Sequence, residues 1–268
     1  MSTSPQAIIF EATVMFALAL TITTILHELA HALAGVALGS QPILHDTFVE
    51  HHDLSPGGEA LTAVAGPLFS LIQGVLFFLV LPKMHPFSSL AQQFVLWMAI
   101  HGLVNFFGYL INAPFAPHGD IGAVARYLEL PRTVQFLLLA AGVAANILIG
   151  IIATKPLLEL APSPELISAS SARMDYVMHA AIAPWLLGAA IVILVRYPPR
   201  FAITVIYPAV SGLFAIVSWE HAATLSDVES QAVLANRGAL WPWIIVLVLL
   251  LVLFRFVLAP GVRLSRAT

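Results

Sequence analysis

The sequence has no cysteine and little charge. With no cysteine among its 268 residues, the chain can form no disulfide, no thiolate metal site and no cysteine nucleophile. Charged residues make up only 9% of the chain, against roughly 25% in soluble globular domains. The formal net charge is -3, so no basic surface points to nucleic acid as a partner. Lys and Arg are also absent before the first apolar run, which argues against a cleavable secretory signal.

Apolar residues dominate instead. They form 60% of the chain, with a mean hydropathy of +0.94. A helix needs about 20 apolar residues to cross the hydrocarbon of a bilayer. We therefore expect an all-α polytopic membrane protein with about seven transmembrane helices, surrounded by lipid. The segments long enough to span are Ile8–Leu38, Leu61–Leu81, Leu90–Ile111, Thr133–Thr154, Met174–Val195, Phe201–Trp219 and Leu240–Leu258.

The first apolar segment carries the sequence HELAH, with His27, Glu28 and His31. Two histidines four residues apart lie on one face of a helix, one turn apart, so both rings can reach one metal ion. H-E-x-x-H on a helix is the zinc-hydrolase pattern, in which the glutamate is the general base. Ionisable residues inside a membrane are costly and usually functional. The pattern predicts a Zn²⁺ site with Glu28 as the catalytic base; a hydrogen-bonded structural cluster is the alternative.

Catalytic zinc takes three protein ligands and a water, so a third ligand is expected on the same side of the membrane. The loop after the first helix and the loop after the third both return to that side. Their candidate side chains are His45, Asp46, His51, His52, Asp53, Glu59, His118 and Asp120. The first of these loops begins with a weak alternation that allows a short β-hairpin.

A second group of polar residues follows in the third apolar segment. His101, Asn105 and Asn112 are spaced by four and seven residues, which places them in one stripe of a helix. Two prolines then end the helix. Asp120 comes next, and it either caps the following short helix, its commonest structural use, or returns a carboxylate toward the membrane interior.

These motifs resemble the intramembrane site-2 protease family of zinc metalloproteases. The resemblance rests on HELAH in the first membrane helix, AGPLFS in the second and NAPFAPHGDIG after the third, and it covers about residues 8–128. The family's Asn-to-Asp spacing of eight residues is kept between Asn112 and Asp120. Its Leu-Asp-Gly-Gly becomes Gly-Asp-Ile-Gly here, and the Asn that follows its Gly-Pro pair is Ser70.

The resemblance implies a three-helix metalloprotease core within residues 1–130, with the helices of 131–268 added to the same membrane domain. It implies that His27, His31 and Asp120 bind zinc and that Glu28 activates the water. Asn112 would bind the substrate backbone. His118, Asn105 and His101 are expected to support the ligands or line the cavity.

The Lys and Arg counts of the loops favour a cytoplasmic side that carries Arg126, Arg132, Arg196, Arg200, Arg263 and Arg266. With seven spans this gives an outside N-terminus, in a bacterial-type cytoplasmic membrane. The expected function is hydrolysis of peptide bonds in membrane protein or peptide substrates near the cytoplasmic side.

Two other readings stay open. Zinc transporters of the Zrt/Irt-like type also carry HExxH in a membrane helix, but they have a proline inside the motif and a Glu after its second His; Ala30 and Ala32 stand there instead. A di-iron hydroxylase would need three histidine boxes, and only His51-His52 forms an adjacent pair. A non-protease metalloenzyme on the same fold is the remaining alternative.

Overall fold

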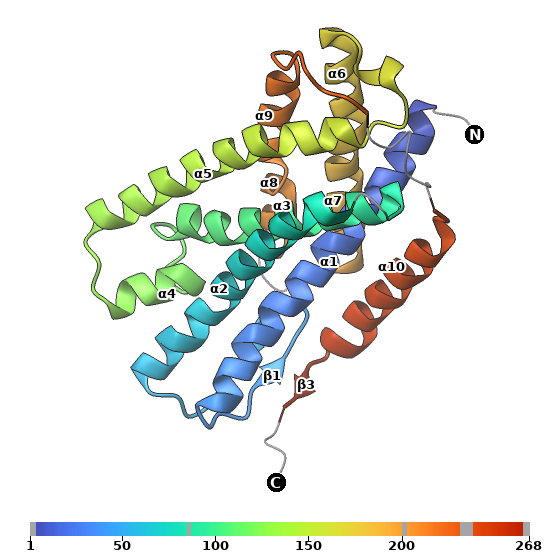
Figure 1. The fold of residues 1–268 in the computed structure, drawn as a ribbon. Helices are drawn as coiled ribbons and strands as arrows, with labels where there is room; N and C mark the ends of the chain where they lie inside the picture. Colours follow the sequence, from blue (N-terminus) through green and yellow to red (C-terminus); the bar gives the residue numbers. More distant parts are fainter. Residues whose placement is uncertain (1–3, 85–86, 200–202, 231–237, 265–268) are drawn as a thin grey trace.

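The computed structural model describes residues 4–84, 87–199, 203–230 and 238–264, and the chain is mostly helical (Figure 1). Six helical stretches in the described part are long and apolar enough to cross a membrane. The expected all-α membrane architecture is therefore confirmed. The long helices are α1 (Pro5–Ala37), α2 (Pro56–Val80), α3 (Ser89–Asn112), α5 (Arg132–Glu159), α7 (Ala183–Val195) and α10 (Trp241–Leu253). The 3₁₀ turn η1 (Leu81–Met84) extends α2, and the π-helical turn η4 (Phe254–Leu258) extends α10.

The chain between α5 and α10 is more broken. After the 3₁₀ turn η2 (Pro164–Ile167), α6 (Ser170–Val177) continues through the π-helical turn η3 (Met178–Ile182) into α7. The segment expected to be the sixth span is divided into α8 (Ile203–Val210) and α9 (Leu213–Ala222), and residues 200–202 lie outside the described part. The count of seven spans stays a prediction.

Trp185 lies against the break between α8 and α9. Its indole N–H donates to the carbonyl of Pro208, 3.1 Å away. A Cβ built on Gly212 would overlap the Trp185 ring, so only glycine allows this close approach. Packing against Trp185 therefore fixes the bend.

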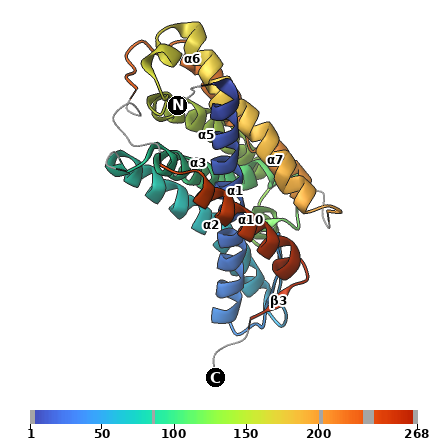
Figure 2. The same cartoon turned by 90° about the vertical axis from the view of Figure 1, so that its right-hand side faces the viewer.

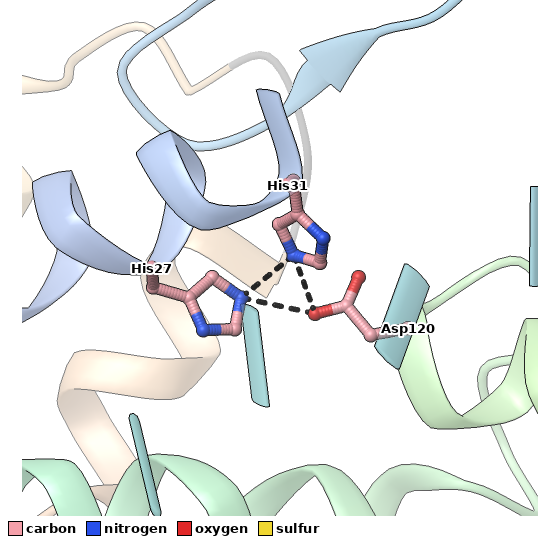
Figure 3. A group of neighbouring side chains, drawn as sticks. All are labelled: His27, His31 and Asp120. Carbon is pink, nitrogen blue, oxygen red and sulfur yellow. Dashed lines mark hydrogen bonds and ion pairs between the residues drawn. The ribbon is translucent and has the colours of Figure 1, made fainter. Parts of the chain in front are cut away.

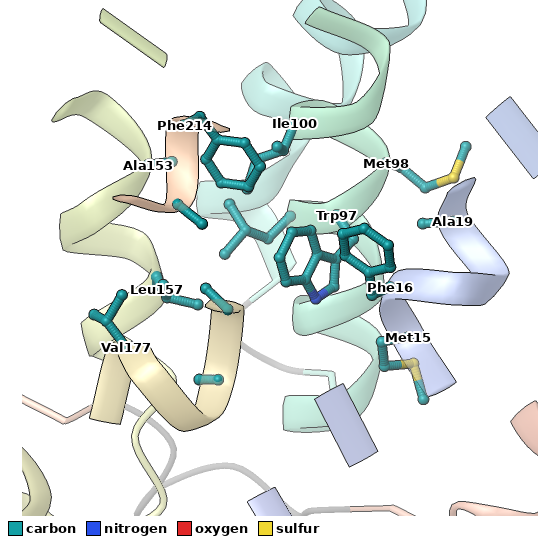
Figure 4. Close-up of a cluster of buried hydrophobic side chains, with 14 of the residues drawn as sticks. Met15, Phe16, Ala19, Trp97, Met98, Ile100, Ala153, Leu157, Val177 and Phe214 are labelled. Atoms are coloured by element: carbon teal, nitrogen blue, oxygen red, sulfur yellow. The ribbon is translucent and has the colours of Figure 1, made fainter. Parts of the chain in front are cut away.

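Helix α1 is the central element of the structure. Ser4 accepts a hydrogen bond from the amide of Ala7, and Pro5 begins the first turn, a favourable start for a helix. Its 33 residues correspond to about 50 Å. Around it lies the main hydrophobic core (Figure 4), in which Trp97 makes edge contacts with Phe16 and Phe214 at centroid distances of 5.0 and 6.0 Å. Because this core takes residues from both halves of the chain, they pack as one body.

Helices α1, α2 and α3 are joined by a buried polar contact and a close approach. The amide of Gln73 on α2 donates to Thr23 Oγ1 on α1 and to the carbonyl of Met98 on α3, at 2.8 and 3.0 Å. A Cβ on Gly102 would lie 2.5 Å from the backbone nitrogen of Gly74. Small residues of this kind let membrane helices approach closely. The contact fixes the position of α2 relative to α3.

The loop after α1 forms the expected β-hairpin. Strands β1 (Ile43–Leu44) and β2 (Val49–Glu50) pair antiparallel, so this prediction is confirmed. A third strand, β3 (Val262–Arg263), pairs with the other edge of β1, which the sequence pattern did not indicate. Figure 2 shows β3 beyond the end of α10, so the C-terminal part of the described chain lies beside the end of α1.

Candidate metal centre

Three side chains converge at the C-terminal half of α1 (Figure 3). His27 and His31 extend from α1, and Asp120 extends from the first turn of the short helix α4 (Asp120–Tyr127). The Asp120 Oδ2 atom lies 3.0 Å from His27 Nε2 and 3.2 Å from His31 Nε2, and the two Nε2 atoms are 3.0 Å apart. The structure thus brings together the two histidines and the one carboxylate named as zinc ligands.

The turn between α3 and α4 aims Asp120 at α1. The carbonyl of Asn112 accepts from the amides of Phe115 and Ala116, so the chain reverses directly after α3. Gly119 takes the cap position of α4 without a side-chain hydrogen bond, and Asp120 is the first helical residue. The interpretation of Asp120 as a helix cap is therefore wrong. A Cβ on Gly122 would overlap the Ala116 carbonyl, so the tight turn requires glycine there.

Residues of helix α2 contact the Nδ1 atoms of both imidazole rings. His31 Nδ1 lies 2.6 Å from the backbone carbonyl of Thr62. A carbonyl only accepts, so Nδ1 carries the hydrogen and Nε2 of the neutral ring carries a lone pair. His27 Nδ1 lies 3.1 Å from Ser70 Oγ. Partners of this kind fix the orientation of metal-binding histidines.

The donor set fits a divalent metal ion. With neutral rings whose Nδ1 atoms donate, two nitrogen lone pairs and a carboxylate oxygen face one another, an arrangement that needs a positive charge between them. Ligands about 2.0–2.1 Å from a tetrahedral ion lie roughly 3.3 Å apart, close to the separations found here. Without an ion, a proton on His31 can supply this positive charge. Burial alone would raise the pKa of the Asp120 carboxyl, but a charged His31 and the hydrogen bonds with both histidines hold it well below its usual range. The carboxyl is therefore ionised at neutral pH.

Gly66 lies against both rings. A Cβ at this position would overlap His31 Nε2 and lie 2.8 Å from His27 Cε1. Gly66 and Pro67 form the Gly-Pro pair of the AGPLFS stretch, and both lie inside α2. The pair therefore brings the backbone of α2 against the ligand rings.

Tyr109 is the contact residue that the sequence analysis missed. Its ring stacks on His27, with centroids 5.0 Å apart and an interplanar angle of 4°, and its phenol interacts electrostatically with Asp120. The signal was present: Tyr109 follows His101 and Asn105 at the same four-residue spacing, so it lies on the same helical stripe.

Glu28 is buried, with 5% of its surface exposed. The charges that act on it most strongly are those of His31, Asp120 and Arg196. Arg196 comes from the end of α7, in the half of the chain for which the sequence suggested no site residue. This cation and two site residues therefore act on Glu28 through their charges.

Arg196 is held by two elements. One Nη atom lies 3.4 Å from Thr24 Oγ1 on α1, and the guanidinium carbon lies 4.7 Å from the centroid of the Phe254 ring at the end of α10. Burial lowers the pKa of Arg196 to about 10, against the opposing charges of Asp46 and Glu28. It therefore remains a buried cation at neutral pH.

The other predicted residues lie outside the ligand cluster. Asn112 ends α3 and lines a separate cavity. His118 is exposed, and its Nδ1 lies 2.8 Å from an Arg126 nitrogen. His101 is fully buried against Phe16 and Trp97. Asn105 is buried beside Tyr207.

The loop candidates for the third ligand also lie elsewhere. His45 stacks on Phe48 and lies 3.4 Å from a Glu50 oxygen. His51 packs against the backbone of α1 at Gly35. Within the described residues, the group able to hold a metal contains His27, His31 and Asp120 and none of the first-loop side chains.

Comparison with protein-family models, curated proteins and solved structures finds no match to the chain.

Proposed function

We propose that the chain is an intramembrane zinc metalloprotease of the site-2 protease type, which hydrolyses peptide bonds of transmembrane substrates near the cytoplasmic side. The observation that supports this most strongly is the convergence of one ligand atom each from His27, His31 and Asp120 within 4.8 Å, beside Glu28 in a helix apolar enough to span a membrane. An H-E-x-x-H helix with a third ligand from a distant segment is the zinc-hydrolase arrangement.

His27, His31 and Asp120 would hold the zinc ion in this function. A bound zinc ion lowers the pKa of its water to about 7 and polarises a carbonyl group. Ser70 and the Thr62 carbonyl orient the two rings so that both Nε2 atoms face Asp120. Tyr109 supports the set from α3.

Glu28 transfers the proton in the proposed reaction. It takes a proton from the attacking water as the water oxygen bonds to the peptide carbonyl carbon. It then gives that proton to the departing nitrogen as the C–N bond breaks. Asn112 pairs with the substrate backbone, which must leave the helical form to expose its amides, since helical amides are bonded internally.

Seven passages across the membrane agree with how α8 and α9 lie. Ser170 and Arg173, at the start of α6, donate to the carbonyls of Ala223 and Ala222 at the end of α9, at 3.2 and 2.9 Å. Helices α8 and α9 begin just after α7 ends and finish beside the start of α6. In this proposal they run back beside α6 and α7 as one bent passage. This count supports an outside N-terminus and a zinc site on the cytoplasmic side of a bacterial-type membrane.

The test is a Glu28→Gln variant of the purified full chain. We expect about one zinc per chain in both forms, and a loss of at least ~100-fold in the cleavage rate of a synthetic transmembrane peptide. Glu11→Gln, a carboxylate change on the same helix, is the matched control and should cleave normally. Unchanged turnover by Glu28→Gln would refute the proposal. Zinc uptake into proteoliposomes would favour a transporter, and two irons per chain an oxygenase.

A further inference from the structure

A cavity of about 270 Å³ lies between α3, α5, α8 and α9. Its volume falls just below the roughly 300–1,000 Å³ of small-molecule sites. The walls are mostly apolar, with Asn112, Asn146 and Tyr207 among the few polar members. It is therefore shaped for an apolar group of limited size.

Two glycines of α5 mark the two ends of the stretch that lines the cavity. A Cβ on Gly142 would lie 2.7 Å from the Phe107 carbonyl of α3, and one on Gly150 would lie 2.7 Å from the Phe214 carbonyl of α9. The stretch of α5 between these two close contacts carries wall residues Val143 and Ile147. Because α5 is fixed to a different helix at each end of this stretch, the space between them belongs to the packing of the fold.

The polar side chains of the walls differ in their partners. Asn146 donates to the carbonyl of Gly142 at 2.9 Å, and Ser211 donates to that of Pro208 at 2.9 Å. No hydrogen bond of the Asn112 side-chain amide is found within the described residues. An amide offers both a donor and an acceptor, which is what an extended peptide backbone needs.

Asn112 also connects the cavity to the metal centre. It lies three residues after Tyr109 on α3, so the two are neighbours on the helix surface. Tyr109 contacts both His27 and Asp120. A peptide held at Asn112 therefore has Tyr109, which stacks on a metal ligand, one helical turn away and the apolar cavity directly beside it.

We propose that this cavity is a specificity pocket, which binds a large apolar side chain of the substrate close to the cleaved peptide bond while Asn112 pairs with the backbone. This inference rests on the proposed proteolytic function. A Leu or Phe side chain occupies a large part of the space, whereas an Ala side chain leaves most of it empty. Loss of one methylene contact in such a pocket changes selectivity by about 10–200-fold.

Gly108 is the position at which to test the pocket. It lines the cavity. Among the described residues, the atom of another element within 4 Å of a Cβ built there is Tyr207 Cε2, at 3.9 Å. Gly108→Leu therefore adds a side chain to the cavity without a backbone clash. Gly108→Ala adds one methyl group at ordinary contact distance and is the matched control.

The experiment uses synthetic transmembrane peptides that differ at one position, as Ala, Leu or Phe, with cleavage sites mapped by mass spectrometry. The wild type should cleave the Leu and Phe peptides at least ~10-fold faster than the Ala peptide. Gly108→Leu should remove this preference, and Gly108→Ala should keep most of it. Binding of the same peptides to the Glu28→Gln variant, with and without Gly108→Leu, should show the same change independently of turnover.

The outcomes separate the two proposals. If the wild type cleaves and Gly108→Leu keeps the preference in both readouts, the pocket is refuted and the protease function stands. If the wild type cleaves none of the peptides, both proposals fail. If Gly108→Leu instead loses a phospholipid seen by native mass spectrometry while the peptide preference is unchanged, the cavity is a lipid site and the pocket is refuted.

Discussion

The ring of Tyr109 lies parallel to the ring of His27, 5.0 Å away between centroids, while its phenol interacts electrostatically with Asp120. One residue of α3 thus contacts a ligand from α1 and a ligand from α4. It supports the ligand that is furthest along the chain from the histidines.

Tyr109→Phe should weaken zinc binding while leaving the helix packing intact. The variant keeps the ring stack and loses the phenol group that interacts with Asp120. Loss of an outer partner of a metal ligand typically costs 10–100-fold in affinity, and about 10-fold is expected here because the stack remains. Zinc affinity is measured by competition with a chelator. Tyr109→Leu, which removes the stack as well, should bind more weakly still; equal affinities for both variants would show that the stack contributes nothing.

Ser70→Ala should also lower the zinc affinity, because it removes the partner of His27 Nδ1. The expected loss is about 10–100-fold. Thr62→Val is the matched control. It removes only a hydroxyl that bonds to the Glu59 carbonyl and keeps the backbone oxygen that holds His31. A similar loss in both variants would contradict a specific role for Ser70.

Gly66→Ala should disrupt the metal centre, since its Cβ would overlap a ligand nitrogen of His31. We expect the zinc affinity to fall at least about 100-fold, the upper end of what an outer partner contributes. Gly58→Ala lies on the same helix, and its Cβ meets no atom closer than 3.4 Å, so it should retain the metal. Zinc content after dialysis compares the two, and retained zinc in Gly66→Ala would disprove the close approach.

Arg196→Met should destabilise the fold. It removes a buried cation that bonds to Thr24 Oγ1, packs on the Phe254 ring and acts electrostatically on Asp46 and Glu28. Loss of a hydrogen bond made by a charged group costs about 1.5–3 kcal/mol. The measurement is unfolding in detergent by heat or denaturant. Arg255→Met, at an exposed position near the same ring, should change the stability by about 0.5 kcal/mol or less. Equal stability of wild type and Arg196→Met would refute the structural role of this cation.

The sequence was sufficient for the membrane class because the cost of polar groups in lipid leaves a strong signal in composition. It also placed α1 within a few residues and indicated the hairpin. It did not indicate the bend between α8 and α9, which Trp185 and Gly212 fix through a packing contact between segments that are not adjacent in the chain. Strand β3 was missed because it pairs with a segment far away in the chain. Its two residues also have no periodicity to detect.

The sequence by itself determined that His27 and His31 lie together, because residues four apart on a helix are neighbours on one face. Only the tertiary structure decided that Asp120 joins them in preference to His118 or the first-loop candidates. That choice depends on the turn formed around Gly122 and on how α4 packs against α2. It also decided that Tyr109, Ser70 and Gly66 surround the ligands and that Arg196 reaches Glu28 from α7. These contacts join residues that the helix packing brings together, and neither spacing nor periodicity along the chain encodes them.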